Sequence, residues 1–390
     1  MDQLTQQFVE QHLSDDVHVL ALKTAPQGVD ISMALQQISA RQLLAKKVPT
    51  WAKNSQLHFP PHLSLEQCSS EETARYKASL VSGNKLVDLT GGMGVDCYFL
   101  SQQFQSTAYV EKLPHLVELA NHNFAILNPK VEVYNDDAEA FLKQMPPVDV
   151  IYIDPARRDT KGQKTVSIHD CTPDVSFLQQ NLLEKAYQVL IKLSPMLDIS
   201  LALSDLQHVK SVHVVSVGNE CKELLFLLER NYTDETTIYA VNLPQKNQTP
   251  FAFNSSQEKV LTIDYATEPI SYLYEPHAAL LKAGAFKLIT AQYPVKKLHI
   301  NSHLYTSKEL IGDFPGRTFK ILNWAPFNKQ IGKGLLAGMT QANMTVRNFP
   351  LSVNELRQKL RLKDGGDFYL FATTLADNQK VLILCEKVLI

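Results

Sequence analysis

The sequence has few cysteines and no long apolar run. Its five cysteines, in a chain of 390 residues, show no CxxC spacing, which argues against a zinc site and against a disulfide framework. No apolar run approaches the roughly 18 residues of a membrane-spanning helix, and the N-terminal segment lacks the basic and apolar stretches of a signal peptide. These absences predict a cytoplasmic protein with no bound metal and no membrane partner.

Net charge is also small, at −2, but it is divided unevenly along the chain. Residues 83–267 carry 15 Lys and Arg against 23 Asp and Glu, whereas residues 268–390 carry 16 against 9. A basic C-terminal third joined to an acidic middle is typical of a module that meets a polyanion such as RNA. A solvated surface would give the same surplus, so charge alone leaves both interpretations open.

Residues 1–82 show the periodicity of helices. Apolar residues recur at helical spacing from Ile31 until Pro49 ends the run. Further on, Ser69 and Glu72 have the spacing of a capping box, which predicts a helix that starts after Ser69.

The pattern changes at Lys85, where short apolar runs begin to alternate with helical segments. This alternation predicts an α/β fold with a largely parallel, doubly wound Rossmann-like sheet. Within this block we expect residues 221–230 to form a helix. Beyond about residue 265 the pattern becomes α+β, with a helix expected over residues 353–362.

The first predicted strand of this sheet ends in a glycine-rich turn. It ends at Asp88 and is followed by Thr90, Gly91, Gly92 and Gly94 before a helix. In open α/β sheets ligands bind outside the carboxyl ends of the strands. Glycines permit a tight turn and a close approach of a ligand, and the N–H groups at the start of a helix favour an anionic group. A glycine-rich turn can equally be purely structural.

Acidic residues end the next two strands. Glu111 lies about twenty residues after the glycines, where a carboxylate can accept hydrogen bonds from both ribose hydroxyls of a nucleoside. Asp136 and Asp137 follow the third strand, where an adenine amine could be bound. A surface Glu is often only solvated, and Asp residues also cap helices, so these alternatives stay open.

The fourth strand ends in the sequence DPAR, residues 154–157. Pro155 stops the strand and holds the Asp154 carboxylate and the next carbonyl at the edge of the sheet. Arg157, Arg158 and Lys161 form a basic cluster in an otherwise acidic block, which suits either a phosphate of RNA or a solvated surface.

Together these strand ends resemble the motifs of the class I S-adenosylmethionine-dependent methyltransferases. VDLTGGMGVD is similar to the first motif, with Thr90 in place of its usual first glycine, and DPAR is similar to the fourth motif, which carries catalytic polar residues. Glu111 matches the ribose-binding acid and Asp137 the adenine-site position. The resemblance implies S-adenosylmethionine as cofactor, a cofactor site made of Asp88, Thr90, Gly91, Gly92, Gly94, Glu111, Asp136 and Asp137, and catalytic roles for Asp154, Pro155 and Arg157.

More specifically, the chain resembles a bacterial group that joins this domain to ferredoxin-like and THUMP-like regions. The stretches EQCSSEETARYKA, NECKELL, YLYEPHAALLKAG, NSHLYTS and FPGRTF carry this resemblance. It implies a helical region over 1–82, a methyltransferase domain over 83–265, a ferredoxin-like domain over 266–317 and a THUMP-like RNA-binding domain over 318–390. THUMP-type modules imply RNA binding, commonly to tRNA or rRNA. The group is also distantly similar to trimethylguanosine synthase, which methylates guanine N2 in RNA caps.

The residues also restrict the atom that receives the methyl group. Methylation of pyrimidine carbon-5 needs a cysteine nucleophile. Uracil enzymes of that kind share DPAR but carry a cysteine after the next strand, where this chain has KLSP at 192–195. Amine methylation needs a positioned carboxylate or carbonyl that accepts an N–H, a role open to Asp154. The familiar amine enzymes have an aromatic residue in place of Arg157, so stacking by another aromatic side chain, a phosphate contact by Arg157 and loss of catalysis all stay open.

Basic residues accumulate in the C-terminal block. Arg357 and Arg361 are four residues apart, so the expected helix would present both on one exposed face that can follow a phosphate backbone. We expect the nearby Trp324, Phe327 and Phe349 in the core rather than as platforms for stacked bases.

These features predict an S-adenosylmethionine-dependent RNA methyltransferase that acts on a base nitrogen of structured RNA. A noncatalytic RNA-binding protein that retains the nucleoside pocket is one alternative, and a small-molecule methyltransferase with a basic accessory domain is another. A nicotinamide enzyme is disfavoured, because Cys97 stands where the dinucleotide fingerprint has a third small residue and because dinucleotide binding does not require DPA at the fourth strand.

Overall fold

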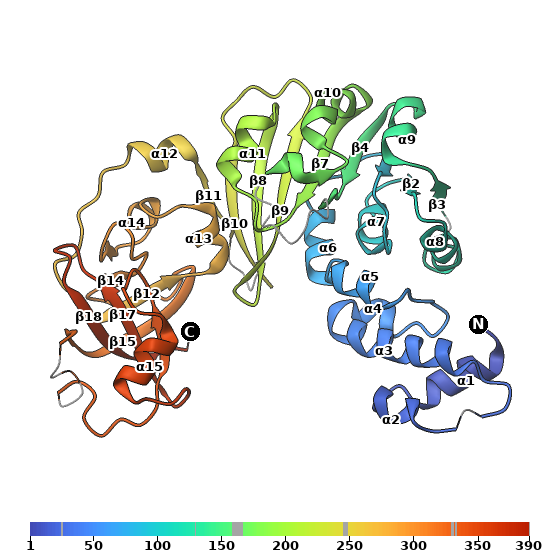
Figure 1. Cartoon of the computed structure of the whole chain (residues 1–390). Coiled ribbons are helices and arrows are strands. Elements are labelled where there is room, and N and C mark those ends of the chain that lie inside the picture. The colour runs from blue at the N-terminus through green and yellow to red at the C-terminus, as the bar shows by residue number, and fades with distance from the viewer. Residues whose placement is uncertain are drawn as a thin grey trace. The chain divides into compact units, whose positions relative to one another are not determined.

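The computed structural model describes residues 1–390 except 25, 129, 158–166, 245–248, 329–330, 332–333 and 390, and the side chains of residues 63 and 157 are not among those described. The chain forms two compact units: residues 1–212 with 223–234, and residues 213–222 with 235–390. The predicted α/β fold, with a helical N-terminal region and an α+β C-terminal region, is confirmed (Figure 1).

Helices form the N-terminal region of the first unit, as its periodicity predicts. Asp30 caps the helix that begins at Ile31 by accepting a hydrogen bond from the N–H of Met33, and this helix ends at Lys47, two residues before Pro49. The elements are α1 (Gln3–Gln11), α2 (Val17–Ala21), α3 (Ile31–Lys47), α4 (Pro49–Ala52), α5 (His62–Gln67) and α6 (Glu71–Ala78).

Helix α6 begins one residue later than its sequence pattern predicts. Ser70 is the N-cap, and its hydroxyl accepts a hydrogen bond from the N–H of Thr73. The predicted capping box of Ser69 and Glu72 is therefore wrong. Ser69 instead donates its hydroxyl to the carboxylate of Asp96 at 2.7 Å, and Asp96 lies in α7 (Val95–Ser101), against which α6 packs.

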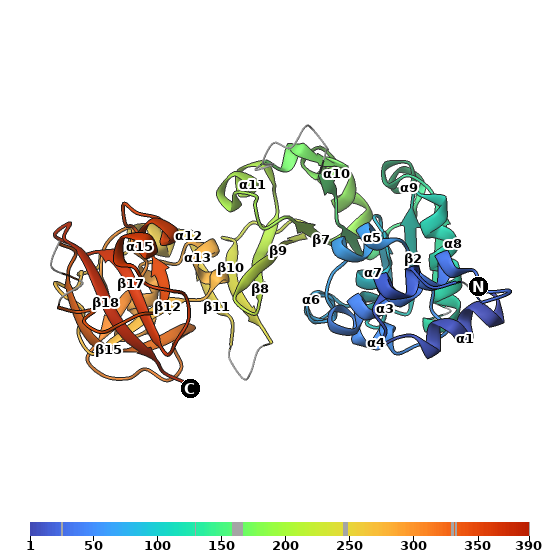
Figure 2. The same cartoon turned by 60° about the horizontal axis from the view of Figure 1, so that its bottom comes forward.

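The sheet of the first unit has the strand order β9-β7-β4-β1-β2-β3. Its parallel strands are β1 (Lys85–Asp88), β2 (Ser106–Glu111), β3 (Val131–Asn135), β4 (Val148–Ile153) and β7 (Ala186–Leu193). The helices between and after them are α7, α8 (Pro114–Leu127), α9 (Ala138–Gln144), α10 (Val175–Lys185) and α11 (Ile199–Asp205). Because parallel crossovers are right-handed, α7 and α8 lie on one face of the sheet and α9 and α10 on the other (Figures 1 and 2). The strand order reverses between β1 and β4, where this fold class forms its ligand crevice.

The helix expected over residues 221–230 is wrong, because these residues lie in the strand β9 (Glu220–Glu229). Its buried apolar run from Leu224 to Leu228 suits a buried helix as well as a strand. Antiparallel pairing with β7, in which Leu190 lies opposite Leu227, decides the outcome. Tertiary pairing has therefore overridden local helix propensity here.

Aromatic packing holds α7 and α8 to the sheet. Tyr109 from β2 and Phe124 from α8 meet edge to face at 5.5 Å, beside Cys97 from α7 and Val131 from β3. Burying an aromatic side chain of this size contributes about 1.5–3 kcal/mol. The faces of α7 and α8 are therefore fixed by β2 and β3, and Tyr109 of β2 also packs against the glycine turn between β1 and α7.

The second unit contains two groups of strands. Residues 213–217 of β8 (Val209–Val217) lie next to β10 (Thr237–Leu243), which pairs with β11 (Phe251–Asn254). A second sheet has the order β13-β14-β12-β15-β18-β17-β16, in which β16 and β17 are parallel and the other pairs are antiparallel. Its strands are β12 (Tyr272–Pro276), β13 (Lys296–Lys297), β14 (Tyr305–Ser307), β15 (Gly316–Pro326), β16 (Asn343–Val346), β17 (Phe368–Thr374) and β18 (Lys380–Lys387), and its helices are α12 (Ser255–Val260), α13 (Ala278–Ala283), α14 (Leu288–Gln292) and α15 (Val353–Leu360).

Both faces of the central strands in this second sheet are buried. Phe371 and Ile383 point into one cluster, and their neighbours Leu370 and Leu382 point into the other, with Leu356 of α15. The period of two follows from the alternation of side chains along a strand. The near-continuous apolar sequences of β17 and β18 are thus explained by burial on both sides.

Candidate active site

The glycines of the β1–α7 turn are required for two reasons, a left-handed backbone and a lack of space for side chains. Gly92 and Gly94 have φ angles of 53° and 86°, which side chains other than glycine rarely adopt. Gly91 has no room for a side chain, because a Cβ there would lie 2.1 Å from the Tyr109 ring. The Tyr109 hydroxyl also donates a hydrogen bond to the Gly92 carbonyl at 2.5 Å. On the other side the turn is open, since a Cβ at Gly92 would meet nothing closer than 3.8 Å.

Glu111, at the end of β2, binds this turn. One carboxylate oxygen accepts a hydrogen bond from the Gly92 N–H at 2.9 Å, and the other accepts one from the Leu113 N–H at 2.9 Å. The carboxylate is buried, so each of these charge-assisted bonds is stronger than a neutral one. Glu111 therefore fixes the shape of the glycine turn, and its predicted contact with a ribose stays a prediction.

Asp88 and Thr90 connect the ends of β1 and β4. The fully buried Asp88 accepts a hydrogen bond from the Thr90 N–H at 3.0 Å, and its second oxygen has no hydrogen-bond partner among the described residues. Burial, helped by the nearby carboxylates of Asp96 and Asp154, raises the pKa of Asp88 well above its ordinary value. Thr90 Oγ1 accepts a hydrogen bond from the Asp154 N–H at 2.7 Å, which gives a structural reason for threonine where the motif usually has glycine.

Asp136 and Asp137 lie after β3 and contact the start of α9. Asp137 is the N-cap and accepts hydrogen bonds from the N–H groups of Glu139 and Ala140. Asp136 accepts one from the side chain of Gln144 at 2.9 Å. The helix-capping alternative thus describes Asp137 in this structure, while a role toward adenine stays a prediction for both residues.

The DPAR segment leaves the sheet directly after β4. Asp154 keeps a partly exposed carboxylate, Pro155 is buried, and residues 156 and 157 form β5 (Ala156–Arg157) against β6 (Cys171–Thr172), after the short 3-10 helix η1 (Ile168–Asp170). The side chain of Arg157, together with Arg158 and Lys161, lies outside the described residues.

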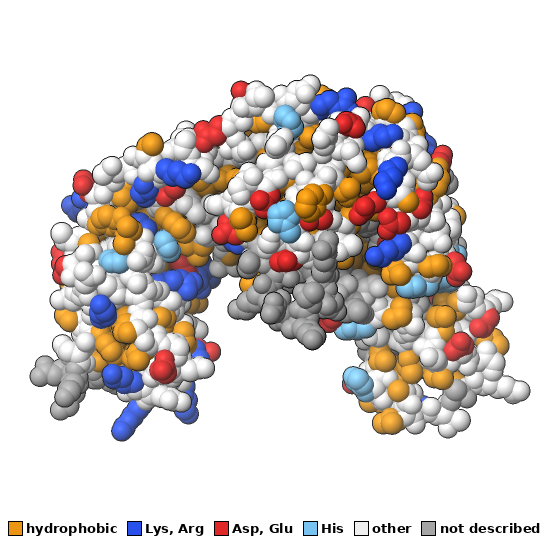
Figure 3. Space-filling model, turned by 45° about the horizontal axis from the view of Figure 1, so that its top comes forward, with side chains coloured by type: hydrophobic (Ala, Val, Ile, Leu, Met, Phe, Trp, Pro, Cys, Tyr) orange, Lys and Arg blue, Asp and Glu red, His pale blue; other side chains and the backbone are white. Residues whose placement is uncertain are grey.

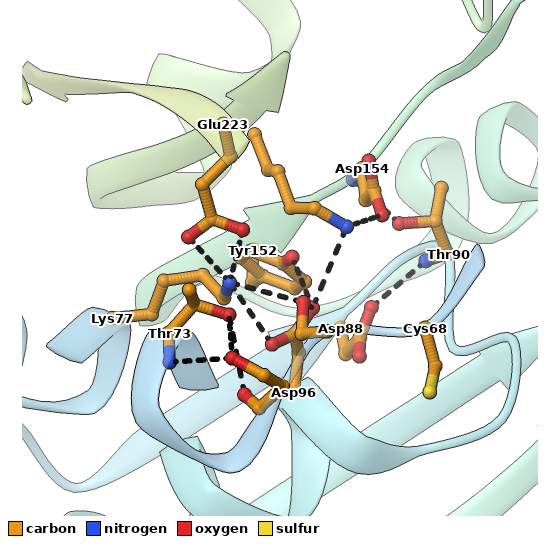
Figure 4. Close-up of polar contacts among 12 residues, drawn as sticks. Cys68, Thr73, Lys77, Asp88, Thr90, Asp96, Tyr152, Asp154 and Glu223 are labelled. Carbon is orange, nitrogen blue, oxygen red and sulfur yellow. Dashed lines mark hydrogen bonds and ion pairs between the residues drawn. The ribbon is translucent and has the colours of Figure 1, made fainter. Parts of the chain in front are cut away.

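A network of buried charges that the sequence reasoning missed joins Asp154 (Figure 4). Lys192, from β7, forms an ion pair with Asp154, and its ammonium lies 3.8 Å from Asp96. Lys77, from α6, lies 3.2 Å from Asp96 and is 2.7 Å and 2.8 Å from the two carboxylate oxygens of Glu223 on β9. Although burial acts in the opposite direction, Asp154 and Asp96 hold the pKa of Lys192 above its ordinary value, so this amine is charged at neutral pH.

Asp96 is the centre of this network. Although burial opposes its charge, Lys77 and Lys192, with hydrogen bonds from the hydroxyls of Ser69 and Tyr152, lower the pKa of Asp96. Its position in the first turn of α7 also favours an anion, because the N-terminal end of a helix carries a partial positive charge.

One sequence signal could have found these residues: charge inside an apolar pattern. Lys77 occupies the face of α6 that buries Thr73, Ala74 and Ala78. Lys192 interrupts the apolar run of β7. Charged side chains are almost never fully buried unless they are paired, so such positions point to an internal partner.

Cysteine and metal chemistry receive no support from the described residues. Figure 4 shows Cys68 alongside the network, but burial raises the pKa of its thiol to about 11. At neutral pH it is therefore a protonated thiol and a weak nucleophile. No cluster of His, Cys, Asp and Glu suited to a metal ion occurs in the described part of the chain.

The expected basic face in the C-terminal block is wrong in its geometry. Helix α15 ends at Leu360, and Arg361 follows it in a left-handed conformation with φ 57°, so the helix does not continue through Arg361. Arg357 forms an ion pair with Asp364 and is partly buried. Arg361 is exposed. The expectation for the aromatics holds, since Phe327 and Phe349 pack edge to face at 5.1 Å and Trp324 packs against a core cluster.

The fold and the arrangement of the strand ends define a Rossmann-like methyltransferase domain, and comparisons with known proteins identify its family. A ferredoxin-like domain model matches residues 272–315, and a THUMP domain-like model matches residues 316–387. Over its whole length the chain is similar to a "putative methyltransferase" from Porphyromonas gingivalis W83, with 36% identity, 100% of both chains covered and a TM-score of 0.89. The chain belongs to the family of that protein, and the predicted membership of the bacterial methyltransferase group with these C-terminal domains is confirmed.

Other solved structures match only part of the chain. The structure of M. capricolum TrmK in complex with S-adenosyl-homocysteine has 13% identity and a TM-score of 0.33, over 42% of this chain and 70% of that one. An rRNA methylase from Streptococcus thermophilus has 14% identity and a TM-score of 0.31, over 40% and 94%. Similarities at this level carry no functional argument. A comparison with curated proteins finds no match. In the residues that the structure describes, no helix is long and apolar enough to span a membrane.

Proposed function

We propose that this protein is an S-adenosylmethionine-dependent methyltransferase that modifies a base nitrogen of structured RNA, either tRNA or rRNA. The observation that carries the proposal is the junction at the ends of β1, β2 and β4. There the glycine turn held by Glu111 is joined through Thr90 to the partly exposed carboxylate of Asp154. A nucleoside-binding turn and a polar acceptor are the two parts that amine methylation needs.

The described residues fit S-adenosylmethionine. Asp88 presents a buried oxygen without a partner, and the Gly92 side of the turn is open. Each Glu111 oxygen accepts one N–H and keeps capacity for a ribose hydroxyl. Asp96 and Asp154 add negative charge, which suits a sulfonium cation. We assign the ribose to Glu111 and the carboxylate of the cofactor to the start of α7.

Methyl transfer to an amine requires no strong base from the protein. When bound, the cofactor supplies an electrophilic methyl group. Asp154 then accepts a hydrogen bond from the N–H of the target amine and orients the nitrogen lone pair along the line of attack. Pro155 has no N–H and holds this acceptor at the sheet edge. Exclusion of water and correct distance supply most of the acceleration, since no strong base is needed.

RNA binding is proposed for the basic part of the chain. Residues 268–390 carry 16 Lys and Arg against 9 Asp and Glu, and Figure 3 shows Lys and Arg side chains on the surface of the C-terminal part. The THUMP domain-like match over residues 316–387 supports the same role. We include Arg157, Arg158 and Lys161 as phosphate contacts, because they form a basic cluster in the sequence directly after Asp154 and Pro155.

Labelled methyl transfer tests this function. RNA from a deletion strain serves as substrate, and mass spectrometry of its nucleosides against the parent strain identifies the product. Asp154→Ala should lower transfer by at least about a hundredfold and change cofactor affinity by only a few fold. Asp149→Ala is the matched control. Asp149 lies at the start of β4, the end of the strand opposite to Asp154, and its carboxylate accepts hydrogen bonds from the N–H groups of Asn84 and Lys85.

The outcomes separate the alternatives. Transfer by Asp154→Ala at the parent rate would remove Asp154 from the mechanism. A parent protein that binds the cofactor and RNA but transfers nothing would favour the noncatalytic alternative. Transfer without any RNA affinity would favour a small-molecule substrate.

A further inference from the structure

Charged side chains of alternating sign run without interruption from the core to the proposed site. We call the series Glu223, Lys77, Asp96, Lys192 and Asp154 the charge ladder (Figure 4). Exposure of these side chains rises toward the site: Lys77 is 0% and Glu223 4% exposed, Asp96 11%, Lys192 14% and Asp154 35%. The ladder therefore has a buried inner end and one end that faces solvent.

Stability does not explain such a ladder. Charges lose their hydration on burial, and replacing a buried ion pair by apolar side chains of similar volume is often neutral or stabilising. Lys77 and Glu223, from α6 and β9, are nevertheless buried together beside Asp96 of α7, whose side chain is 11% exposed. The hydroxyls of Ser69 and Tyr152 both donate to Oδ2 of Asp96, and Oδ1 lies 3.2 Å from the Lys77 ammonium. Contacts from several elements therefore restrict the Asp96 carboxylate to one geometry, which is the property that a reacting site requires.

The ladder fixes the orientation of Asp154. The backbone N–H of Asp154 is bound by Thr90, and one carboxylate oxygen, Oδ2, is bound by Lys192. Lys192 is held by Asp96, which is itself held by Lys77 and by Tyr152. The ion pair with Lys192 occupies Oδ2, and Oδ1 is the oxygen that can accept an N–H from the substrate.

We propose that Lys192 is a positioning residue for methyl transfer, which holds the Asp154 carboxylate in line for the target amine, and that Asp96, Lys77 and Glu223 hold Lys192 in place. This inference rests on the proposed function. It also restricts the substrate, because a carboxylate can accept a hydrogen bond from an amine N–H without removing its proton. The nitrogen–carbon bond therefore forms as the carbon–sulfur bond breaks, with the electron pair of that bond going to sulfur, and the proton leaves the nitrogen for water afterwards. Such an order suits an exocyclic amine rather than a group that must be deprotonated before it reacts.

Steady-state kinetics of the full chain test the outer step of the ladder. Lys192→Ala should lower kcat by about thirtyfold or more and change the KM for S-adenosylmethionine by less than about threefold, since Lys192 pairs with Asp96 and Asp154 and not with Glu111, to which the ribose is assigned. Added ethylammonium should restore kcat severalfold by filling the space of the missing amine. The matched control is Lys210→Ala, which removes the Lys210–Glu229 ion pair of 2.8 Å in the same unit and should leave kcat unchanged.

The inner step is tested by a double variant that leaves no charge unpaired. Lys77→Met with Glu223→Gln removes one cation and one anion, and kcat should fall about three- to tenfold with an unchanged KM. Calorimetric titration with S-adenosyl-homocysteine checks that each variant is folded and keeps its cofactor site.

The possible results distinguish the role of Lys192 from the proposed methyltransferase function. A Lys192→Ala protein that binds S-adenosyl-homocysteine and turns over at the parent rate overturns the inference and leaves the proposed function intact. A loss of kcat that ethylammonium does not restore, together with a loss of cofactor affinity, assigns Lys192 a structural role and also overturns it. Absence of methyl transfer by the parent protein overturns the proposed function, and this inference falls with it.

Discussion

The two units bury ionisable groups in opposite ways. The first unit buries charged side chains and pairs them, as in the contact of Lys77 with Glu223. In the second unit, burial lowers the pKa values of His213 and His277 to about 4, and partial burial together with Lys297 and Arg347 does the same for His303, so these rings are neutral at pH 7. Paired charges are directional and can hold a reacting group, whereas the neutral rings of His213 and His277 stack on Tyr239 and cap α13, respectively. The comparison therefore separates a unit built around chemistry from one whose cations lie at its surface.

Among the buried charged residues of the second unit, Glu275 resembles those of the first unit because it is paired. It is buried, and it forms ion pairs with Arg317 and Arg347, both of which are partly exposed. The two arginines come from the FPGRTF stretch and from the end of β16, so one carboxylate joins distant parts of the THUMP domain-like match. Gly316 is required beside it, because a Cβ there would lie 2.1 Å from the Glu275 carbonyl oxygen.

The largest expected effect comes from breaking the inner ion pair of the first unit. Lys77→Met leaves Glu223 buried without its partner and should lower the free energy of unfolding by about 3–5 kcal/mol. Arg75→Met on the same helix removes an exposed pair with Glu71 and should cost about 1 kcal/mol or less. Urea unfolding of both variants measures the difference, and equal losses would contradict the contrast between buried and exposed pairs.

Acid should destabilise the second unit more than the first. His213 and His277 have pKa values of about 4 in the folded state and 6.5 when unfolded, so the unfolded chain binds more protons between these values. The stability of the second unit should therefore fall as pH drops from about 6.5 to about 4, by up to about 3 kcal/mol for each fully buried ring. Asp88 has a raised pKa and binds its proton more tightly in the folded state, which favours the first unit as pH falls. His58, whose pKa is also lowered to about 4, offsets part of this gain.

Hydrogen exchange of peptides from each unit at pH 7 and pH 5, corrected for intrinsic rates, measures this difference. His213→Phe keeps a ring against Tyr239, with which His213 stacks at 4.7 Å, and should remove part of the acid sensitivity of the second unit. Equal loss of protection in both units at pH 5 would contradict the prediction.

Cofactor affinity tests whether the glycine turn of the first unit is a nucleoside site. Glu111→Ala removes charge-assisted hydrogen bonds worth about 1.5–3 kcal/mol each and should weaken S-adenosylmethionine binding roughly tenfold to a few hundredfold. Glu132→Ala on the neighbouring strand is the control, because Glu132 is exposed and is hydrogen-bonded only locally by Tyr134. Calorimetric titration with S-adenosylmethionine measures the affinity of each variant. Unchanged affinity in Glu111→Ala, or tight NAD binding by the parent, would rule out the assignment.

The smallest expected effects concern the cations of the second unit. Arg361→Ala should lower the slope of log K against log salt for RNA binding by about one unit at most. Arg357→Ala should lower it less, because Arg357 is already paired with Asp364. Filter binding with tRNA and rRNA fragments over a range of salt measures both slopes, and RNA binding that does not depend on salt would contradict a phosphate-binding surface.

The sequence predicts the parts of the site that local rules determine. Gly91, Glu111 and Asp154 stand at strand ends that periodicity identifies, and the parallel sheet brings those ends to one edge. Lys77 and Glu223 could not be paired from the sequence, because they are 146 residues apart and come from separate layers of the fold. The same long-range pairing turned residues 221–230 from an expected helix into a strand.

The left-handed backbone of Arg361 ends α15 and explains why the predicted basic face does not form. The spacing of Arg357 and Arg361 predicts a shared face only while the helix continues. Left-handed backbone conformations favour glycine, so an arginine at the C-cap gives no sequence signal for the end of the helix. By contrast, the residue type of Asp137 itself indicates a helix cap, and Asp137 is the N-cap of α9 in the structure.

The ion pair between Lys77 and Glu223 also has a consequence for the order of folding. Synthesis proceeds from the N-terminus, so a growing chain contains Lys77 and all five parallel strands long before Glu223 is made. Until then Lys77 lacks one of the two carboxylates that its ammonium contacts, and β7 lacks its antiparallel neighbour β9. Residues 213–222, which belong to the second unit, must also emerge before β9 can close the first. The first unit is therefore completed late, by a strand that follows a segment of the second.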